Sequence, residues 1–263
     1  MSANQLIYAM LSHPGLVRRG NEDACAASLE SGAFVVCDGM GGAAAGEVAS
    51  HLAAKTFLSY LTSPTTNGNH AASPQARLCA AIHAANQAVY QHSRQSSRLA
   101  GMGTTLVALL APVRNERSED PVLWLAHVGD SRCYRLRHGH LQQLTHDHSL
   151  VGEQLRAGQI TPAQAVVSPM RNIITRAIGS RPGVVPEIES HYLRPNDLYL
   201  LASDGLSHEI SDCEIETILA AIPTPATQSA LTEACEVLIA AANGRGGHDN
   251  ITVLLVSISS TYL

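Results

Sequence analysis

An aspartate at the end of a buried strand, followed at once by glycines, is the feature that most constrains this chain. Residues 34–37 (FVVC) form an apolar run that ends at Asp38, and three glycines follow within four positions. Such a run indicates a buried strand, and the glycines permit positive φ angles or a close approach of the backbone directly after it. The sequence therefore predicts a carboxylate at the edge of a sheet.

The same pattern returns three more times along the chain. The apolar runs 123–128 and 198–202 lead into Asp130 and Asp204, and Asp249 stands just before the apolar run 251–256. Four sheet segments therefore carry an aspartate at one end. If these ends converge, they form a cluster of carboxylates that cannot all remain charged without a cation.

Composition and charge narrow the class of protein. The 263 residues carry a formal net charge of −5 with no cluster of basic residues, which argues against nucleic acid as a partner. No apolar run reaches the roughly 18 residues of a membrane span, and residues 1–10 lack the basic start and the cleavage signature of a signal peptide. We therefore expect a cytoplasmic protein that acts as a monomer away from the membrane. The six cysteines show no CxxC spacing and are expected to be reduced core thiols.

The succession of apolar patterns predicts an α+β fold in a single domain that spans residues 1–263. Helical periodicity marks 45–61, 74–94 and 225–242, and a capping-box pattern starts another helix at Ser211, while short connections between strands indicate antiparallel pairing. The expected architecture is a central sandwich of two antiparallel β-sheets, flanked on both sides by antiparallel helix pairs in α-β-β-α layers.

Other segments connect these elements. The polar segments 62–73 and 114–121 are expected as surface connections, and residues 101–110 as one strand. The segment 148–167 has apolar residues among polar ones and glycines, which indicates an insertion with one or two short helices.

The candidate metal ligands are nearly all carboxylates, with His248 as the exception. They are Glu22, Asp23, Asp38, Asp130, Asp204 and Asp249. Hard oxygen ligands favour Mg²⁺ or Mn²⁺ over Zn²⁺. A carboxylate shared by two ions about 3.5–4 Å apart would activate a water for in-line attack on phosphorus. Arg18 or Arg19 could hold the phosphate oxygens, so the residues predict hydrolysis of a phosphate ester.

Competing catalytic patterns are absent from the sequence. No cysteine has an arginine at C-x5-R spacing, and neither HExxH nor GxSxG occurs. Residues 39–44 match the loose dinucleotide fingerprint GxGxxA, but no acid lies about 20 residues further on, and a second helix follows where a parallel strand is required.

Seven motifs occur in an order that resembles the metal-dependent protein phosphatases of type 2C (PPM family) in their compact bacterial form. They are Arg18 with NED at 21–23, DGMGG at 38–42, GMGTT at 101–105, VGDSR at 128–132, LTHDHS at 144–149, SDG at 203–205 and HDNIT at 248–252. The match spans residues 15–256. It implies the same sandwich fold and hydrolysis of phosphoserine and phosphothreonine in proteins, opposing a cellular Ser/Thr kinase.

The resemblance also implies a ligand set for two Mn²⁺ or Mg²⁺ ions. Asp38 would bridge the two metals, with Asp204 and Asp249 completing the first site. Glu22 and the carbonyl of Gly39 would complete the second.

Further roles follow from the same resemblance. Asp23 would orient water from behind the ligands, and Arg18 would bind the substrate phosphate. Asp130, with Asp204, would hold a third, weaker ion in the manner of bacterial relatives. The insertion 148–167 would be a flap beside the cleft that influences substrate choice.

One departure and one alternative stay open. Met40 stands where animal relatives carry a histidine proposed to protonate the leaving oxygen, so the general acid is unassigned. A metal-bound water is the preferred donor. His127 and His248 are further candidates, for which a structural hydrogen-bonding role is the favoured alternative. The chain could also be a catalytically inactive binding module on the same fold. Such modules lose metal-binding aspartates, whereas Asp38, Asp204 and Asp249 are all present.

Overall fold

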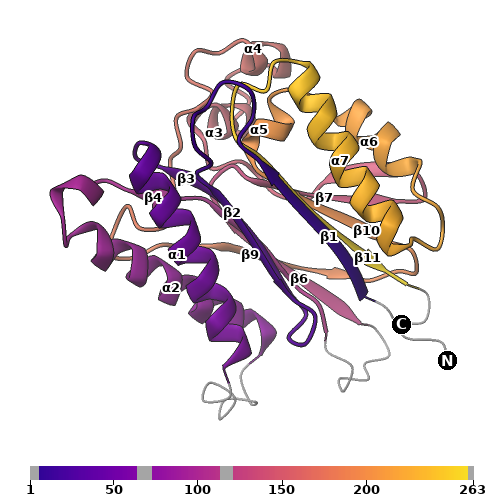
Figure 1. Ribbon diagram of the computed structural model, residues 1–263, viewed down its shortest axis with the longest axis horizontal. Helices are drawn as coiled ribbons and strands as arrows, with labels where there is room; N and C mark the ends of the chain where they lie inside the picture. Colours follow the sequence, from indigo (N-terminus) through magenta and orange to yellow (C-terminus); the bar gives the residue numbers. More distant parts are fainter. Residues whose placement is uncertain (1–5, 64–72, 113–120, 260–263) are drawn as a thin grey trace.

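Two antiparallel sheets form the centre of the computed structural model, which describes residues 6–63, 73–112 and 121–259. The first sheet has five strands in the order β1-β11-β10-β7-β8 (Figure 1). Their bounds are β1 Leu6–His13, β11 Ile251–Ile258, β10 Leu198–Ala202, β7 Arg132–Arg137 and β8 His140–Gln143. The N-terminal and C-terminal strands of the described chain are therefore neighbours along their whole length, with Leu6 opposite Ile258.

The second sheet has six strands in the order β2-β3-β5-β6-β9, with β4 paired to β3. Their bounds are β2 Asp23–Ser28, β3 Ala33–Met40, β4 Gly103–Thr104, β5 Leu106–Leu110, β6 Val122–Val128 and β9 Glu187–Tyr192. The single strand expected over 101–110 is interrupted at Thr105. The interruption is caused by a contact with a neighbouring strand, because the Thr105 N–H donates to the carbonyl oxygen of Asp38 and the Thr105 hydroxyl accepts from the Asp38 N–H.

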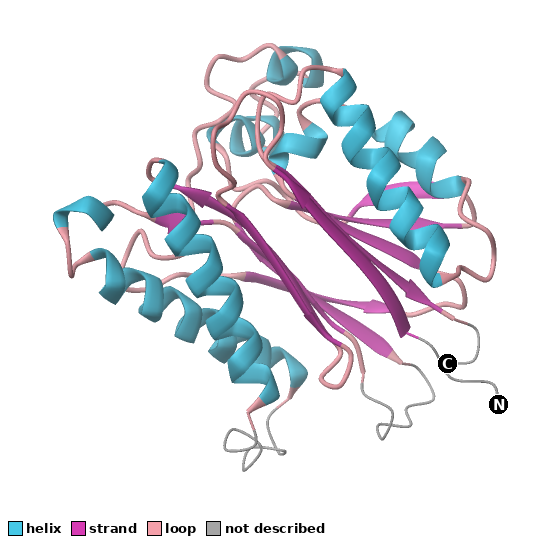
Figure 2. Cartoon of the chain, viewed as in Figure 1, coloured by secondary structure: helices cyan, strands magenta, loops and turns pink. Residues whose placement is uncertain are grey.

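Helix pairs cover the outer faces of both sheets, which confirms the predicted fold (Figure 2). Helices α1 (Ala43–Thr62) and α2 (Pro74–Ser93) pack on the six-stranded sheet through a core that includes Phe57 and Ile82. Helices α6 (Asp212–Ala220) and α7 (Gln228–Gly244) pack on the five-stranded sheet. Helix α6 starts with the expected capping box, whereas α7 begins later than expected because Thr227, not a residue near Pro225, caps its first turn.

The strand β11 shows why the central strands read as continuous apolar runs. Ile251, Val253 and Leu255 face the helices α6 and α7, whereas Leu254 and Val256 face the other sheet. Every residue of β11 is buried, because alternate side chains enter two different apolar layers. The strand ends are consequently fixed to within a residue, and the groups that follow them are held in place.

The segment between β8 and β9 contains α3 (Leu150–Arg156) and α4 (Pro162–Val166), the short helices expected in 148–167. Its backbone closes on itself through the bridge between Ser149 and Ile174 and through the hydrogen bond from Thr175 N to His148 O (2.8 Å). We call residues 148–176 the flap segment. Its action as a flap stays a prediction.

Two short helical elements complete the described secondary structure. A 3-10 turn, η2 (Ser97–Leu99), follows α2, and a four-residue helix, α5 (Asp204–Ser207), follows β10. The six cysteines are unpaired, and Cys37, Cys133 and Cys235 are buried. Of the two expected surface connections, 62–73 and 114–121, residues 64–72 and 114–120 lie outside the described part of the chain. Among the described helices, none has the length and apolarity that a membrane crossing requires.

Candidate metal centre

The strand ends that carry the acidic residues meet at one end of the sandwich, near the loop between β1 and β2 and the helices α3, α4 and α5 (Figure 1). Asp38 lies near the end of β3, directly opposite Asp23 at the start of β2. Burial raises the pKa of Asp38 well above its usual range, and the charges of Asp23, Asp204, Asp130 and Asp249 raise it further. The structure thus brings together the carboxylates that the sequence placed on separate strands. We call these five aspartates and Glu22 the acidic cluster.

The backbone of Asp38 is held rigidly. Its carbonyl oxygen accepts hydrogen bonds from the Thr105 N–H (2.8 Å) and the Thr104 hydroxyl (2.8 Å), and its N–H donates to the Thr105 hydroxyl (2.9 Å). Thr105 also shares a hydrogen bond with the buried Ser131. Thr104 and Thr105 therefore support the backbone of Asp38 through hydrogen bonds.

Asp38 and Asp204 are close enough to share a hydrogen bond, which requires that one of them hold a proton. Burial raises the pKa of Asp204, and the negative charge of Asp249 adds to that shift. Without a cation, the centre of the cluster therefore takes up protons in order to limit the number of buried charges.

One carboxylate oxygen of Asp23 has hydrogen-bond partners and the other has none among the described residues. Its Oδ2 accepts hydrogen bonds from the hydroxyls of Ser203 (2.8 Å) and Thr252 (2.7 Å), whereas its buried Oδ1 has no hydrogen-bond partner in the described chain. Burial raises the pKa of Asp23 to about 7, against the effect of the two hydroxyls. Within the described residues this oxygen stays available to an external partner.

Asp130, in the turn between β6 and β7, repeats this feature. Its side chain is buried, and its Oδ1 has no partner among the described residues. Burial and the nearby Asp204 raise the pKa of Asp130 to about 8. The preceding Gly129 has φ +104°, and a Cβ there would lie 2.6 Å from the Thr105 side chain, so only glycine lets the turn approach this closely.

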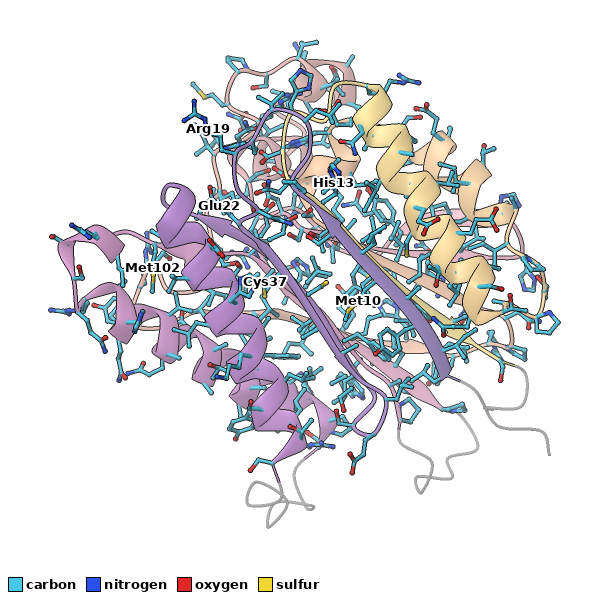
Figure 3. The ribbon with its side chains drawn as sticks, in the orientation of Figure 1. Met10, His13, Arg19, Glu22, Cys37 and Met102 are labelled. Atoms are coloured by element: carbon cyan, nitrogen blue, oxygen red, sulfur yellow. The ribbon has the colours of Figure 1, made fainter. Side chains whose placement is uncertain are left out.

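Glu22 is seated against two glycines. Its backbone carbonyl accepts from the Gly39 N–H (3.1 Å), and a Cβ added at Gly46 would lie 1.8 Å from Glu22 Oε2. Burial is also the main cause of the raised pKa of Glu22. Figure 3 shows Glu22 beside the first turns of α1, which explains why the glycine at position 46 lies inside a helix. This role of Gly46 has no recognisable signal in the sequence.

Arg18 is the arginine that reaches the acidic cluster. Its Nη2 lies 2.8 Å from Asp249 Oδ2, and the arginine side chain is half exposed. Burial alone would lower the pKa of Arg18, but the carboxylates of Asp249 and Glu22 raise it. Among the salt bridges of the described residues, only this one and the contact of His208 with Asp204 (3.4 Å) touch the cluster.

Asn250 was quoted as part of a motif but was assigned no role by the sequence. Its side-chain amide donates to Pro14 O (2.9 Å) and Gly20 O (2.8 Å), and its Oδ1 accepts from the Glu22 N–H (2.8 Å). One side chain therefore fixes the loop that carries Arg18 and Glu22 next to Asp249. The only signal available in the sequence was its position directly after Asp249.

The two histidines considered as general acids contact other groups. His248 Nδ1 lies 2.7 Å from Glu209, and the His127 ring packs against His148 at a centroid distance of 4.6 Å. Both arrangements favour the structural alternative. His208, which the sequence did not single out, lies nearer to the cluster through its contact with Asp204.

The donor set of the acidic cluster suits hard divalent cations. It offers carboxylate oxygens, two of them buried without partners, and a rigid backbone at Asp38. Buried charge without a counter-charge is costly, and a bound cation would remove this cost and allow the carboxylates to ionise. The residues present therefore fit Mg²⁺ or Mn²⁺.

Comparisons with known proteins agree with this geometry. A family model described as protein phosphatase 2C matches residues 18–236. The chain is 40% identical over 255 residues to the serine/threonine protein phosphatase PstP of Mycobacterium tuberculosis, covering 96% of this chain and 45% of that protein. It therefore spans less than half the length of that relative. It is 38% identical over 251 residues to the serine/threonine phosphatase Stp of Listeria monocytogenes, with 92% of each chain covered.

A solved structure extends the similarity to the fold. The crystal structure of the catalytic domain of a serine/threonine protein phosphatase PstP, in complex with two manganese ions, superposes with a TM-score of 0.81 and 36% identity, covering 97% of this chain and 99% of that one.

Proposed function

Because the chain belongs to the protein phosphatase 2C (PPM) family of bacterial serine/threonine phosphatases, we propose that it hydrolyses phosphoserine and phosphothreonine in proteins. The observation that carries this proposal is the acidic cluster, in which two buried carboxylate oxygens, on Asp23 and Asp130, lack partners in the described chain. A module that only binds partners would gain nothing from so costly an arrangement of charge. The retained cluster therefore supports an active enzyme.

The proposed cofactors are Mn²⁺ or Mg²⁺ ions, two in the core site. Asp38, Asp204 and Asp249 would hold one ion. Asp38, Glu22 and the carbonyl oxygen of Gly39 would hold the other. When bound, the cations supply Lewis acidity and lower the pKa of water at the site. The solved relative with two manganese ions supports this number of ions.

Asp130 is proposed to hold a third, weaker ion together with Asp204. Its unpartnered Oδ1 and the pKa of about 8 indicate a carboxylate whose charge is not yet balanced. The turn that carries it is fixed by Gly129 and Thr105, so little rearrangement is needed for it to serve as a ligand.

Asp23 is proposed to orient the attacking water. The hydroxyls of Ser203 and Thr252 fix one of its oxygens, which leaves Oδ1 in a single direction as a hydrogen-bond acceptor. A carboxylate held in this way can accept a proton of the water and align its lone pair toward phosphorus.

Arg18 is proposed to bind the phosphate of the substrate. Its guanidinium is held on Asp249, and a cation that takes over Asp249 would release it toward a phosphate at the same edge. Arg19 is exposed and lies on the outer side of this loop (Figure 3), so it is the weaker candidate. The assignment of Arg18 over Arg19 follows from this contact.

The physiological partners are proposed to be phosphoproteins made by a cellular Ser/Thr kinase in the cytoplasm, where ATP is available to such kinases. The flap segment is proposed to influence which of them is accepted. Both proposals rest on the family's activity, and the identity of each partner is a matter for experiment.

The direct test is hydrolysis of p-nitrophenyl phosphate and of a phosphothreonine peptide by metal-stripped protein to which Mn²⁺, Mg²⁺, Zn²⁺ or no metal is returned. Activity should return with Mn²⁺ or Mg²⁺. It should be lost in Asp38→Asn, and it should persist in Asp212→Asn, a matched change of an exposed aspartate at the start of α6. If folded protein hydrolysed neither substrate with any of the metals, the proposal would be rejected in favour of a binding module.

A further inference from the structure

A second cluster of ionisable side chains lies at the base of the flap segment, around Glu187 at the start of β9. His148 Nε2 lies 2.9 Å and Arg176 Nη1 3.3 Å from Glu187 Oε1, and Arg156 Nη1 lies 3.8 Å from the same oxygen. His127 Nε2 lies 3.5 Å from Oε2. One carboxylate on the sandwich thus contacts three residues of the flap segment, His148, Arg156 and Arg176. No role in the proposed reaction has yet been assigned to it.

The contact of His148 Nδ1 shows which ring nitrogen of His148 carries the proton. Its Nδ1 accepts a hydrogen bond from the Gly129 N–H (3.2 Å), so the proton of the neutral ring is on Nε2, which lies 2.9 Å from Glu187 Oε1 but is not aligned for a hydrogen bond to it. Burial lowers the pKa of His148 and brings that of His127 to about 4, so both rings are neutral near pH 7. The positive charge that balances Glu187 therefore comes from Arg156 and Arg176.

A metal ion is the obvious alternative occupant. His127, His148 and Glu187 each offer a ligand atom, and these atoms lie within 4.8 Å of one another. A ligand nitrogen must present a lone pair, however, and the bond from Gly129 places the proton of His148 on the nitrogen that would have to bind. Arg176, 3.3 Å from the same carboxylate, also repels a cation. The contacts therefore favour a protein-only link.

This link joins the flap segment to the turn that carries Asp130. The His148 N–H donates to the Gly129 carbonyl (3.0 Å), which adds to the bond from Gly129 N to the ring of His148. Arg156 comes from α3, in the middle of the flap segment, and Arg176 from its end. Glu187 therefore connects both ends of the flap segment, and its first helix, to the sheet and to the edge of the acidic cluster.

The flap segment presents apolar side chains that a protein substrate could contact. Val166 and Val167 are 71% and 79% exposed, and Met170 and Ile173 are each 48% exposed. A small aryl phosphate has no polypeptide that would reach this surface. The position of the flap segment should therefore matter for protein substrates and little for small ones.

We propose that Glu187 is a positioning residue for protein substrates, holding the flap segment at a fixed place beside the acidic cluster through His148, Arg156 and Arg176. The proposal rests on the proposed phosphatase function, because it concerns how substrates of that reaction are received. It assigns to Glu187 no contact with the phosphate or with a metal. Its expected signature is a change in KM for phosphoproteins without a matching change for small substrates.

The first test compares Glu187→Gln with Glu189→Gln, a neighbouring β9 carboxylate that lies outside this cluster and contacts His191. With Mn²⁺, Glu187→Gln should raise KM for phosphorylated casein about tenfold, a usual size for coupling between sites. Its kcat for p-nitrophenyl phosphate should stay near the wild-type value, and Glu189→Gln should change neither. Equal losses on both substrates, or no change on casein, would overturn the proposal.

Two further measurements keep the proposal testable if Glu187→Gln misfolds or if the protein has no phosphatase activity. The first uses a second variant, and the second uses hydrogen exchange. Arg156→Gln removes one partner from the surface of α3 and should raise KM for casein by about threefold, since one charge pair of several is lost. Hydrogen exchange needs no activity: amides of residues 150–173 should exchange faster in Glu187→Gln, while those of β11 should not. Unchanged exchange in 150–173 would contradict the link even if the wild type hydrolysed nothing.

Zinc titration of the metal-stripped protein decides the metal alternative. We expect Glu187→Gln and wild type to bind Zn²⁺ equally. A Zn²⁺ site that is lost in Glu187→Gln and kept in Asp38→Asn would show that His127, His148 and Glu187 bind metal, and would overturn the assignment of the His148 proton and with it the proposal.

Discussion

Strand β10 carries an aspartate at each end, and the two carboxylates differ in how their charge is balanced. Asp197, before the strand, is fully buried and accepts two hydrogen bonds from Arg137 (2.7 and 2.6 Å) and one from the Arg194 N–H (2.9 Å). The hydrogen bond to Asp197 is the main cause of the raised pKa of Arg137. At this end of β10 the chain itself supplies the balancing cation, the guanidinium of Arg137.

At the other end of β10, Asp204 lies among carboxylates whose pKa values are raised by burial. Among the arginines and the lysine of the described chain, only the half-exposed Arg18 forms a salt bridge with this group. Both ends bury acid, but only one end contains its own counter-charge. The difference teaches that a buried carboxylate with its own arginine stabilises a fold, whereas a group of buried carboxylates without one indicates a site for an external cation.

The strongest way to test this comparison is to neutralise Asp204. Asp204→Asn removes a proposed ligand, so turnover of p-nitrophenyl phosphate with Mn²⁺ should fall further than the about 10- to 100-fold typical of residues that only support a ligand. The metal-free protein should lose no stability, because one of several buried like charges has gone. Both quantities come from steady-state kinetics and from denaturant unfolding in EDTA. Preserved activity, or a marked loss of stability, would remove Asp204 from the cation site.

The matched change at the other end, Asp197→Asn, should do the opposite. It leaves Arg137 without its carboxylate, which should cost about 3 kcal/mol of unfolding free energy, while activity per folded molecule stays unchanged. The double variant Asp197→Asn with Arg137→Met should recover part of this loss, because no charge is left unpaired. If the single variant unfolded no more easily than wild type, Asp197 would not be the structural counterpart described above.

This contrast also marks what the sequence could and could not predict. The four strand-end aspartates were predictable because each adjoins an apolar run, and the sandwich fold was predictable because runs such as 251–256 read as strands buried on both faces. The pairing of Arg137 with Asp197 was not predictable, since the two residues lie 60 positions apart and no local sequence pattern links them.

The supporting contacts of the site were also hidden for a physical reason. Glu22 packs against Gly46, and Asn250 makes three side-chain hydrogen bonds. Both arrangements depend on a loop that packs against a helix and against β11. Local propensity does not encode such contacts between distant segments. The interruption of the 101–110 strand at Thr105 has the same origin, because it arises from Asp38 on a neighbouring strand. The roles of the site residues themselves stay predictions.

The comparison can be sharpened with pH. The pKa of Asp130 is about 8 in the folded metal-free protein, above its unfolded value of about 3.9, so its contribution to stability is full below about pH 4 and is lost as the pH rises through 8. Between pH 6 and pH 8 the metal-free wild type should lose about 2 kcal/mol that Asp130→Asn does not lose. Denaturant unfolding at both pH values, in EDTA, measures this difference. Parallel curves for the two proteins would mean that Asp130 is ionised without a cation.

The smallest expected effect concerns Arg18. It pairs with a carboxylate, as Arg137 does, but that carboxylate belongs to the acidic cluster. Arg137 is committed to Asp197, whereas Arg18 is half exposed and is held by Asp249 only while no other cation takes that carboxylate. Arg18→Ala should raise KM for p-nitrophenyl phosphate about tenfold through the loss of a charge-assisted contact, with a smaller change in kcat.

The same variant has a second consequence that a purely structural arginine would not show. Because Arg18 competes for Asp249, its removal should leave Mn²⁺ binding equal or tighter, which calorimetric titration of metal-stripped protein measures. Arg19→Ala, a change of the exposed neighbour, should alter neither KM nor Mn²⁺ affinity. Weaker Mn²⁺ binding in Arg18→Ala would make Arg18 a support of the cation site, and a raised KM in Arg19→Ala alone would transfer the phosphate contact to that residue.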